Sequence, residues 1–254
     1  VRVFTLEGNP VPGFPSFLGN SASFTGGIQL TAADVNGDGK PDIITVPSYG
    51  AADVRVFYNQ YPLNPAFQAT PDISFRAFPV AAVGGAVVAA ADMGSLVNGS
   101  FVNVLDGKAE IVVATGGGTK ATVSVFDVSG APPARVQTFF PFTAVNPTFS
   151  GGVSLDVARI DPDGIPDIIA GMGVNGMSRI EVWNWNTGTA TLGLLGEIPN
   201  VFTGPSNNAP VNVAAVDTDG DEIADAIFAV QGPIGTTGEV HRFDITGTSS
   251  SFTY

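Results

Sequence analysis

Short apolar runs, separated by clusters of Gly, Pro, Asn and Asp, dominate the hydrophobic pattern of this chain. Residues 28–33 and 43–46 are two such runs, and residues 54–57 alternate apolar and polar positions as a half-buried strand does. These runs are rich in β-branched and aromatic residues, which is typical of strands bounded by turns. No long segment has a helical period, and 32 Gly and 19 Pro disfavour one. The pattern therefore predicts an all-β chain.

An internal repeat is marked by the strand-like tetrad at residues 54–57, which reads Val-Arg-Val-Phe. Related tetrads stand at residues 1–4, 123–126, 180–183 and 240–243, and a Gly-Gly pair precedes the first apolar run at 26–27, 84–85 and 151–152. Residues 73–78 and 136–140 are candidates for a fourth strand. Four strands per repeat predict the blades of a β-propeller.

These repeats organise the whole chain, residues 1–254, as a single domain. We expect a partial blade at 1–25, followed by repeats at 26–82, 83–149, 150–207 and 208–254. The prediction is a β-propeller of about four to five four-stranded blades.

An acidic loop lies between the first and second strands of each repeat. Its first copy reads Asp34-Val35-Asn36-Gly37-Asp38-Gly39-Lys40-Pro41-Asp42, with oxygen side chains at loop positions 1, 3, 5 and 9. Alternate residues point inward as such a loop curls, and the carbonyl at position 7 can join them, so the loop suits calcium. An EF-hand is excluded because strands flank the loop and Thr45 replaces the Glu of position 12.

Together, the loops, Gly-Gly pairs and tetrads resemble FG-GAP/VCBS repeats over essentially the whole chain. That family forms calcium-binding β-propellers, including the head of integrin α chains and many bacterial surface and secreted proteins. The resemblance implies calcium ligands in the first loop from Asp34, Asn36, Asp38, the Lys40 carbonyl and Asp42. In the last loop it implies Asp217, Asp219, Asp221, the Ile223 carbonyl and Asp225.

The third and last loops each depart from the family pattern. In the third, Arg159 stands where the first acid should be. Two interpretations remain for the implied ligands Asp161, Asp163, the Ile165 carbonyl and Asp167: they hold a weaker ion, or they pair with the guanidinium. In the last loop Glu222 replaces a glycine. A left-handed residue there costs about 1–2 kcal/mol, so this loop is expected to curl differently.

The second loop is split by an insertion at residues 95–105. Only Asp92, Asp106 and Glu110 map onto the family pattern, and Asn103 could supply a further oxygen. Calcium in all of these loops is expected to be structural, because it ties adjacent strands together and neutralises carboxylates that otherwise repel.

Composition limits the partners of the protein. The net charge of −13 disfavours nucleic acid, whose affinity rests on Lys and Arg contacts to phosphate, and it disfavours an anionic membrane surface. The absence of Cys excludes disulfides and cysteine catalysis. The longest nearly apolar stretch, residues 80–91, is shorter than the roughly 20 residues that span a bilayer. Millimolar calcium outside cells suits a secreted or cell-surface location.

Neither the single histidine nor the two tryptophans indicates catalysis. His241 occupies a tetrad position that other repeats fill with Arg, Ser or Glu, so it is interpreted as a half-exposed strand residue. Trp183 takes the aromatic slot of the tetrad. Trp185, flanked by Asn184 and Asn186, is either a packing residue or a sugar-stacking ligand site.

Both ends of the chain offer a third strand, and residues 12–17 and 250–254 are candidates for fourth strands. An open sheet edge invites pairing, so we expect the ends to be completed by another copy or by more of a longer chain. The prediction is a non-enzymatic, extracellular structural or adhesive propeller, as a subunit of a surface layer or filament that contacts itself or other surface proteins. The alternatives are a carbohydrate-binding lectin and a non-catalytic domain of a larger secreted enzyme.

Overall fold

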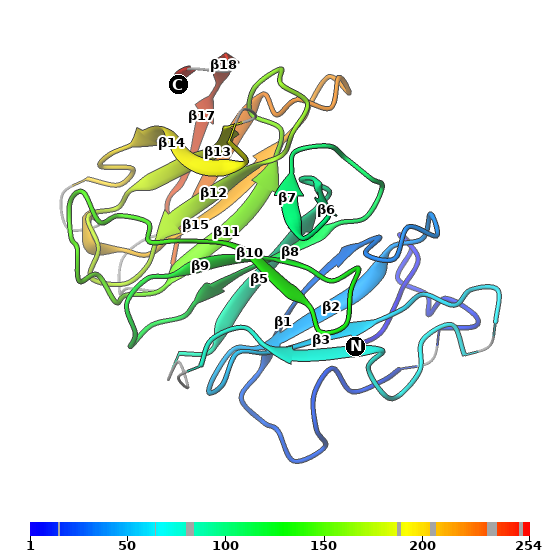
Figure 1. The fold of residues 1–254 in the computed structure, drawn as a ribbon. Coiled ribbons are helices and arrows are strands. Elements are labelled where there is room, and N and C mark those ends of the chain that lie inside the picture. The colour runs from blue at the N-terminus through cyan, green and yellow to red at the C-terminus, as the bar shows by residue number, and fades with distance from the viewer. Residues whose placement is uncertain are drawn as a thin grey trace.

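The computed structural model describes residues 1–14, 16–63, 65–79, 84–186, 189–203, 207–232, 238–248 and 251–254. It is an all-β protein with almost no helix, in which four antiparallel sheets are arranged as a four-blade β-propeller (Figure 1). The predicted fold class is confirmed, and the number of blades is four.

Each blade begins with its innermost strand. Blade 1 contains β1 (Ile28–Ala33), β2 (Asp42–Pro47), β3 (Asp53–Phe57) and β4 (Ile73–Arg76). Blade 2 contains β5 (Ala86–Ala91), β8 (Glu110–Thr115), β9 (Val123–Asp127) and β10 (Ala134–Phe139). Blade 3 contains β11 (Val153–Ala158), β12 (Asp167–Met172), β13 (Ile180–Asn186) and β14 (Thr191–Ile198). Blade 4 contains β15 (Val211–Val216), β16 (Ala226–Gln231) and β17 (Val240–Asp244).

The second strand of each blade carries the most buried sequence. β8 and β12 are buried along their whole length, as near-continuous apolar runs with neighbours on both faces should be. Three apolar layers lie between successive blades, and Ile44, Val112 and Ile227 belong to the first, second and third of them. The innermost strands are in contact in chain order: β1 with β5, β5 with β11, and β11 with β15. The blades therefore stack face to face in sequence order.

Close backbone approach between neighbouring blades explains the second and third Gly-Gly pairs, and a left-handed backbone is common to all three. The second glycine of each pair has a positive φ, +81° at Gly27, +71° at Gly85 and +88° at Gly152. A Cβ on Gly85 would lie 2.2 Å from the carbonyl carbon of Ser48 in blade 1. Both the conformation and the contact require glycine, because other L-residues rarely adopt a left-handed backbone.

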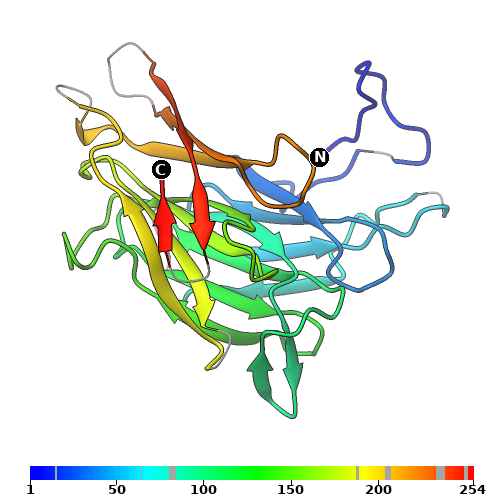
Figure 2. The same ribbon diagram turned by 90° about the horizontal axis from the view of Figure 1, so that it is seen from above.

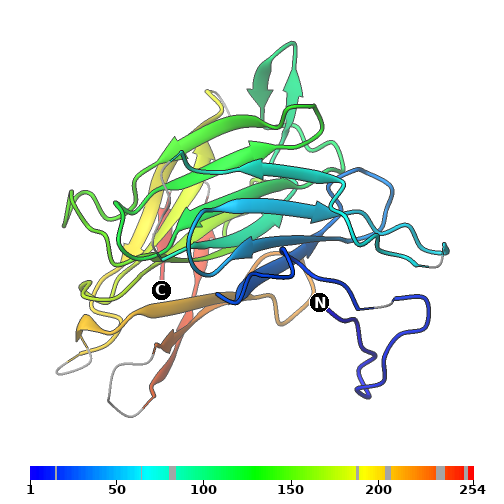
Figure 3. The ribbon, with the colours of Figure 1, turned by 90° about the horizontal axis from the view of Figure 1, so that it is seen from below.

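The insertion in blade 2 forms a separate hairpin. β6 (Ser95–Val97) pairs with β7 (Ser100–Val102) across a turn in which Asn98 and Gly99 both have positive φ. Asn-Gly favours this kind of two-residue hairpin turn. The hairpin projects from the body of the propeller (Figure 3).

At the N-terminal end, residues 1–17 cover the face of blade 1 that is turned away from blade 2. Val1, Val3 and Phe17 pack there with Phe57. The Phe17 N–H donates to the Val1 carbonyl (3.2 Å), and the Val11 N–H donates to the Val3 carbonyl (3.1 Å). The two halves of this segment are thus hydrogen-bonded to each other as an antiparallel pair.

At the C-terminal end, the expected fourth strand of blade 4 is wrong. β19 (Ser251–Thr253) pairs with β18 (Thr246–Thr248) in a separate two-stranded sheet and contacts β14 of blade 3 (Figure 2). Only Ile245 separates β17 from β18. A tight reversal needs at least two turn residues, so β18 continues past β17, and residues 251–253 pair with β18 instead of with β17.

Candidate metal centres

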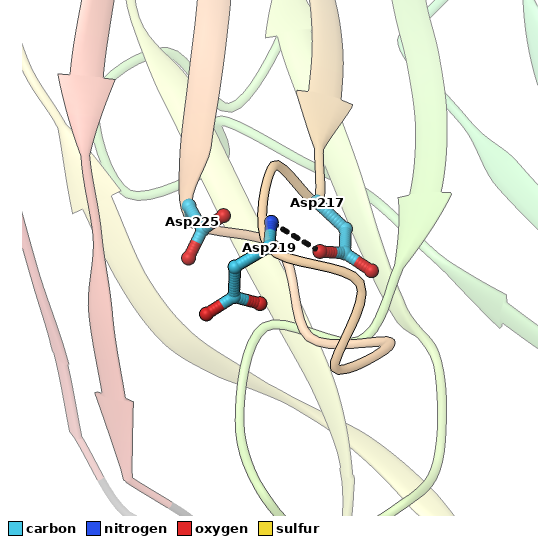
Figure 4. A group of neighbouring side chains, drawn as sticks. All are labelled: Asp217, Asp219 and Asp225. Carbon is cyan, nitrogen blue, oxygen red and sulfur yellow. Dashed lines mark hydrogen bonds between the residues drawn. The ribbon is translucent and has the colours of Figure 1, made fainter.

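The last acidic loop, between β15 and β16, brings three carboxylates together. Oxygen atoms of Asp217, Asp219 and Asp225 lie within 4.8 Å of one another (Figure 4). Asp217 Oδ1 accepts hydrogen bonds from the N–H groups of Asp219 (3.2 Å) and Gly220 (2.7 Å), which hold the loop in its curl. Converging carboxylate oxygens on a flexible loop are the ligands that calcium prefers.

In this loop Asp217 and Asp219 are exposed and Asp225 is half-buried, and hydrogen bonds favour the charged forms of Asp217 and Asp225. Hydrogen bonding from the Gly220 N–H lowers the pKa of Asp217, and hydrogen bonding from the Thr218 hydroxyl lowers the pKa of Asp225. Asp221, the other acid predicted here, accepts a hydrogen bond from the Ile223 N–H (2.8 Å) and is not a member of the three-carboxylate group.

Glu222 adopts the left-handed conformation that its position requires. Its φ is +70°, and its N–H donates to Asp217 Oδ2 at 2.9 Å, so the expectation that this loop curls differently is wrong. Its carboxylate forms an ion pair with Arg159 of the third loop at 2.5 Å. That pair links neighbouring loops, and it offsets part of the backbone strain at Glu222.

The first loop, between β1 and β2, has the same curl. Asp34 Oδ1 accepts a hydrogen bond from the Gly37 N–H (2.7 Å) and Oδ2 accepts one from the Gly39 N–H (2.6 Å). Asp38 forms an ion pair with Lys40 at 2.9 Å. Asp42 is fully buried, accepts hydrogen bonds from Val35 and Asn59, and has its pKa raised to about 6 by burial. The Asn36 side chain accepts a hydrogen bond from the Asp38 N–H (2.9 Å).

The third loop, between β11 and β12, contains an unsatisfied acid. Asp167 accepts a hydrogen bond from the Ile160 N–H through Oδ2 (2.8 Å), while its Oδ1 is buried without a partner among the described residues. Burial raises the pKa of Asp167 to about 8. Asp161 is also fully buried and accepts hydrogen bonds from the Asp163 N–H (2.9 Å) and Asn184 Nδ2 (2.7 Å). Since buried polar atoms are normally paired, the free oxygen fits a cation site.

Two unpaired oxygens lie in the second loop, between β5 and β8. Asp92 Oδ1 and Asn103 Oδ1 are buried and have no hydrogen-bond partner in the described part of the chain. Glu110 is 2% exposed, accepts a hydrogen bond from the Met93 N–H (2.7 Å), and has its pKa raised to about 8 by burial. Asp106 caps the next turn by accepting from the Lys108 N–H at 3.0 Å. The split loop therefore gathers uncompensated oxygens of the kind that a hard cation satisfies.

Trp185 is a core residue, which corrects its assignment as a ligand-binding candidate. Its side chain is 2% exposed in the layer between blades 2 and 3, and its ring lies 5.0 Å from that of Phe101. A sugar needs an exposed aromatic face, so this tryptophan cannot supply one. His241 Nε2 lies 3.3 Å from a Glu239 carboxylate oxygen, and its ring contacts that of Phe202.

Sequence reasoning missed two carboxylates outside the loops, of which Glu181 is buried and Asp156 is half-buried. Asp156 on β11 accepts a hydrogen bond from the Ala215 N–H on β15 (2.7 Å). Glu181 on β13 accepts hydrogen bonds from the Phe142 N–H (2.9 Å) and Trp183 Nε1 (3.0 Å). Burial raises the pKa of both acids. Both residues could have been found from the sequence, because each is an acid within an apolar strand sequence. An acid in such a place needs a hydrogen-bond partner in the folded protein.

Comparison with known proteins identifies the repeat in blade 1. Residues 26–57, from the Gly-Gly pair to the end of β3, match the FG-GAP repeat, and a search of curated proteins finds no match. The fold is a β-propeller, and its first blade is similar to an FG-GAP repeat. Such repeats commonly bind calcium, are typically extracellular, and form a generally non-catalytic structural or binding fold. No helix in the described part of the chain has the length and hydrophobicity to cross a bilayer.

Proposed function

We propose that this protein is an extracellular β-propeller that calcium stabilises and that has a structural or adhesive role. The observation that carries the proposal is the convergence of Asp217, Asp219 and Asp225 in one loop. The buried oxygens of Asp92 and Asp167 support it, because the equivalent loops of two other blades each hold a carboxylate oxygen that has no hydrogen-bond partner among the described residues.

A structural role follows from where the loops lie. Each loop connects the innermost strand of a blade to the buried second strand, so an ion bound there holds the two most central strands together. The ion also offsets the repulsion among the carboxylates that approach it. An ion that binds only the folded state at a concentration 100 times its dissociation constant adds about 2.7 kcal/mol to the free energy of unfolding.

Thermal and urea unfolding with and without calcium tests the metal proposal. Calcium should raise the free energy of unfolding in the wild-type protein, and Asp225→Asn should remove part of that increase. Asp244→Asn is the matched control, because Asp244 is an exposed acid of the same blade that pairs with Arg242 outside the loop. Equal calcium effects in wild type and Asp225→Asn would remove the last loop as a metal centre.

Self-association is the second part of the proposal. β17 has no further partner strand in the sheet of blade 4 as described, and Val240 on it is 63% exposed. At the other end of the chain, Phe4 and Leu30 are 50% and 52% exposed. Because these two surfaces differ, a contact between the β17 edge of one copy and the Phe4 and Leu30 surface of another is head-to-tail. Head-to-tail contacts generate rings or filaments.

Electron microscopy and light scattering test the assembly. In millimolar calcium we expect filaments, sheets or rings that Val240→Lys disperses, because a charge on an edge strand blocks strand addition. Leu194→Lys is the matched control, since Leu194 is an exposed residue of β14 outside both ends. A discrete monomer at high protein concentration would exclude self-association and leave the calcium proposal standing.

A further inference from the structure

A hollow of about 380 Å³ lies beside the β8–β9 turn of blade 2, and we name it the Phe140 hollow. The residues used below are Phe78, Thr119, Lys120, Arg135, Thr138 and Phe140. The acidic loop of this blade precedes β8, whereas Thr119, Lys120 and Phe140 lie near the other end of β8 and β9. Arg135 reaches the hollow from β10, on which it lies opposite Phe126.

Two positive side chains meet at this hollow, although the chain has only 10 Lys and Arg against 23 Asp and Glu. Lys120 and Arg135 are both exposed, and neither forms an ion pair with a described carboxylate. Arg135 donates a hydrogen bond to the Ala77 carbonyl (2.6 Å), which fixes the guanidinium in place. In so acidic a protein, two uncompensated cations at one hollow favour an anionic ligand.

The remaining surface of the hollow is mostly apolar. Phe140 is 43% exposed although it is a large aromatic residue, and Phe78 closes the wall that blade 1 contributes. Lys120 Nζ lies over the Phe140 ring, 4.1 Å from its centre, so the positive charge is held directly against the apolar surface. An apolar ligand body against these rings would remove Phe140 from water.

A hydroxyl group in the hollow has no hydrogen-bond partner. Thr119 Oγ1 is buried and unpaired among the described residues, whereas the hydroxyl of Thr138 is paired with Ser124 at 2.8 Å. A buried hydroxyl without a partner is costly, and a ligand oxygen nearby would satisfy it. This group can donate to a carboxylate that also faces Lys120.

We propose that the Phe140 hollow binds a small carboxylate with an apolar body. The carboxylate faces Lys120, Arg135 and the Thr119 hydroxyl, and the apolar body packs on Phe140 and Phe78. The same chemistry could come from a free monocarboxylate or from an acidic sugar, whose ring has an apolar face. This inference is independent of the calcium sites.

The test is a titration of the ¹⁵N-labelled protein in saturating calcium, followed by two-dimensional NMR. We expect 3-phenylpropionate to shift the amide signals of Thr119, Lys120 and Thr138, with a dissociation constant of about 1–10 mM, as is usual for a ligand of this size. The neutral 3-phenylpropionamide should bind more weakly. Equal affinity of acid and amide, or shifts confined to the acidic loops, would overturn the proposal.

Two variants locate the interaction. Lys120→Gln should weaken binding of 3-phenylpropionate about 3- to 5-fold, the range expected for an exposed ion pair. Arg242→Gln, which removes an exposed cation on blade 4, should leave it unchanged. Equal losses in both variants would show a general charge effect and overturn the proposal. A parallel titration with glucuronate distinguishes the sources, since tighter binding of glucuronate supports an acidic sugar and weaker binding supports a free monocarboxylate.

Discussion

Asp167→Asn should change how the stability of the calcium-free protein depends on pH. Burial raises the pKa of Asp167 to about 8 and that of Glu110 to about 8, whereas both groups ionise near pH 4 in an unfolded chain. Between pH 6 and pH 7 each group is therefore protonated in the folded protein and ionised in the unfolded one.

Because the folded state binds more protons in this window, the free energy of unfolding falls as pH rises. Asp167 and Glu110 each contribute about 1.4 kcal/mol per pH unit to this loss, and Asp42, whose pKa is raised to about 6, adds a smaller part near pH 6. In Asp167→Asn the slope should therefore become shallower by about 1.4 kcal/mol per pH unit. Asparagine still offers an oxygen to the Ile160 N–H, so the variant keeps the hydrogen bond that the loop uses.

The assay is urea unfolding at pH 6.0, 6.5 and 7.0 after removal of metal ions, repeated in saturating calcium. With calcium bound, the carboxylates stay ionised in the folded state, and the slope should become small for both proteins. Asp244→Asn, an exposed acid, is the control and should match the wild-type slope. Identical slopes for wild type and Asp167→Asn without calcium would show that Asp167 is not protonated in the fold.

Three further substitutions test the packing by urea unfolding in calcium. Asp156→Ala leaves the Ala215 N–H without its acceptor and should cost about 2 kcal/mol; no loss would mean that water replaces the carboxylate. Trp185→Ala should cost about 3–5 kcal/mol, and a loss below 1 kcal/mol would contradict its core position. Gly85→Ala should lower the free energy of unfolding more than Gly39→Ala. Both glycines have a positive φ, but only a Cβ at Gly85 would meet the backbone of blade 1, so equal losses would refute that contact.

The strands could be predicted because each blade repeats one local pattern. The tetrad at 54–57 forms most of β3, and the tetrads at 123–126, 180–183 and 240–243 lie in β9, β13 and β17. The Gly-Gly pairs were predicted from repetition alone, and the structure supplies their cause in the contact between Gly85 and the backbone of blade 1. Such contacts between blades involve residues far apart in sequence, which a local pattern does not encode.

The ends of the chain could not be predicted in the same way. A fourth strand at 250–254 was an extrapolation from the other blades, but residues 251–253 pair with β18, which continues past β17 after a single residue. Trp185 shows a similar limit. A Trp between two Asn suggests a surface site, yet the pleat of β13 directs this ring into the layer shared with Phe101. Which face of a strand is buried depends on the neighbouring blade.

Within the candidate metal centres, the sequence identified the acids but not their environments, and the environments imply different calcium affinities. In the last loop, Asp217 is exposed, Asp225 is half-buried, and the pKa values of both are lowered, so calcium meets carboxylates that are already ionised. In the third loop, Asp167 is buried with a pKa of about 8, so calcium must displace a proton at neutral pH. One displaced proton makes apparent affinity change about tenfold per pH unit below that pKa. We therefore expect the last loop to bind calcium at lower concentration and the third loop to bind it only as pH rises, a difference that spacing alone could not show.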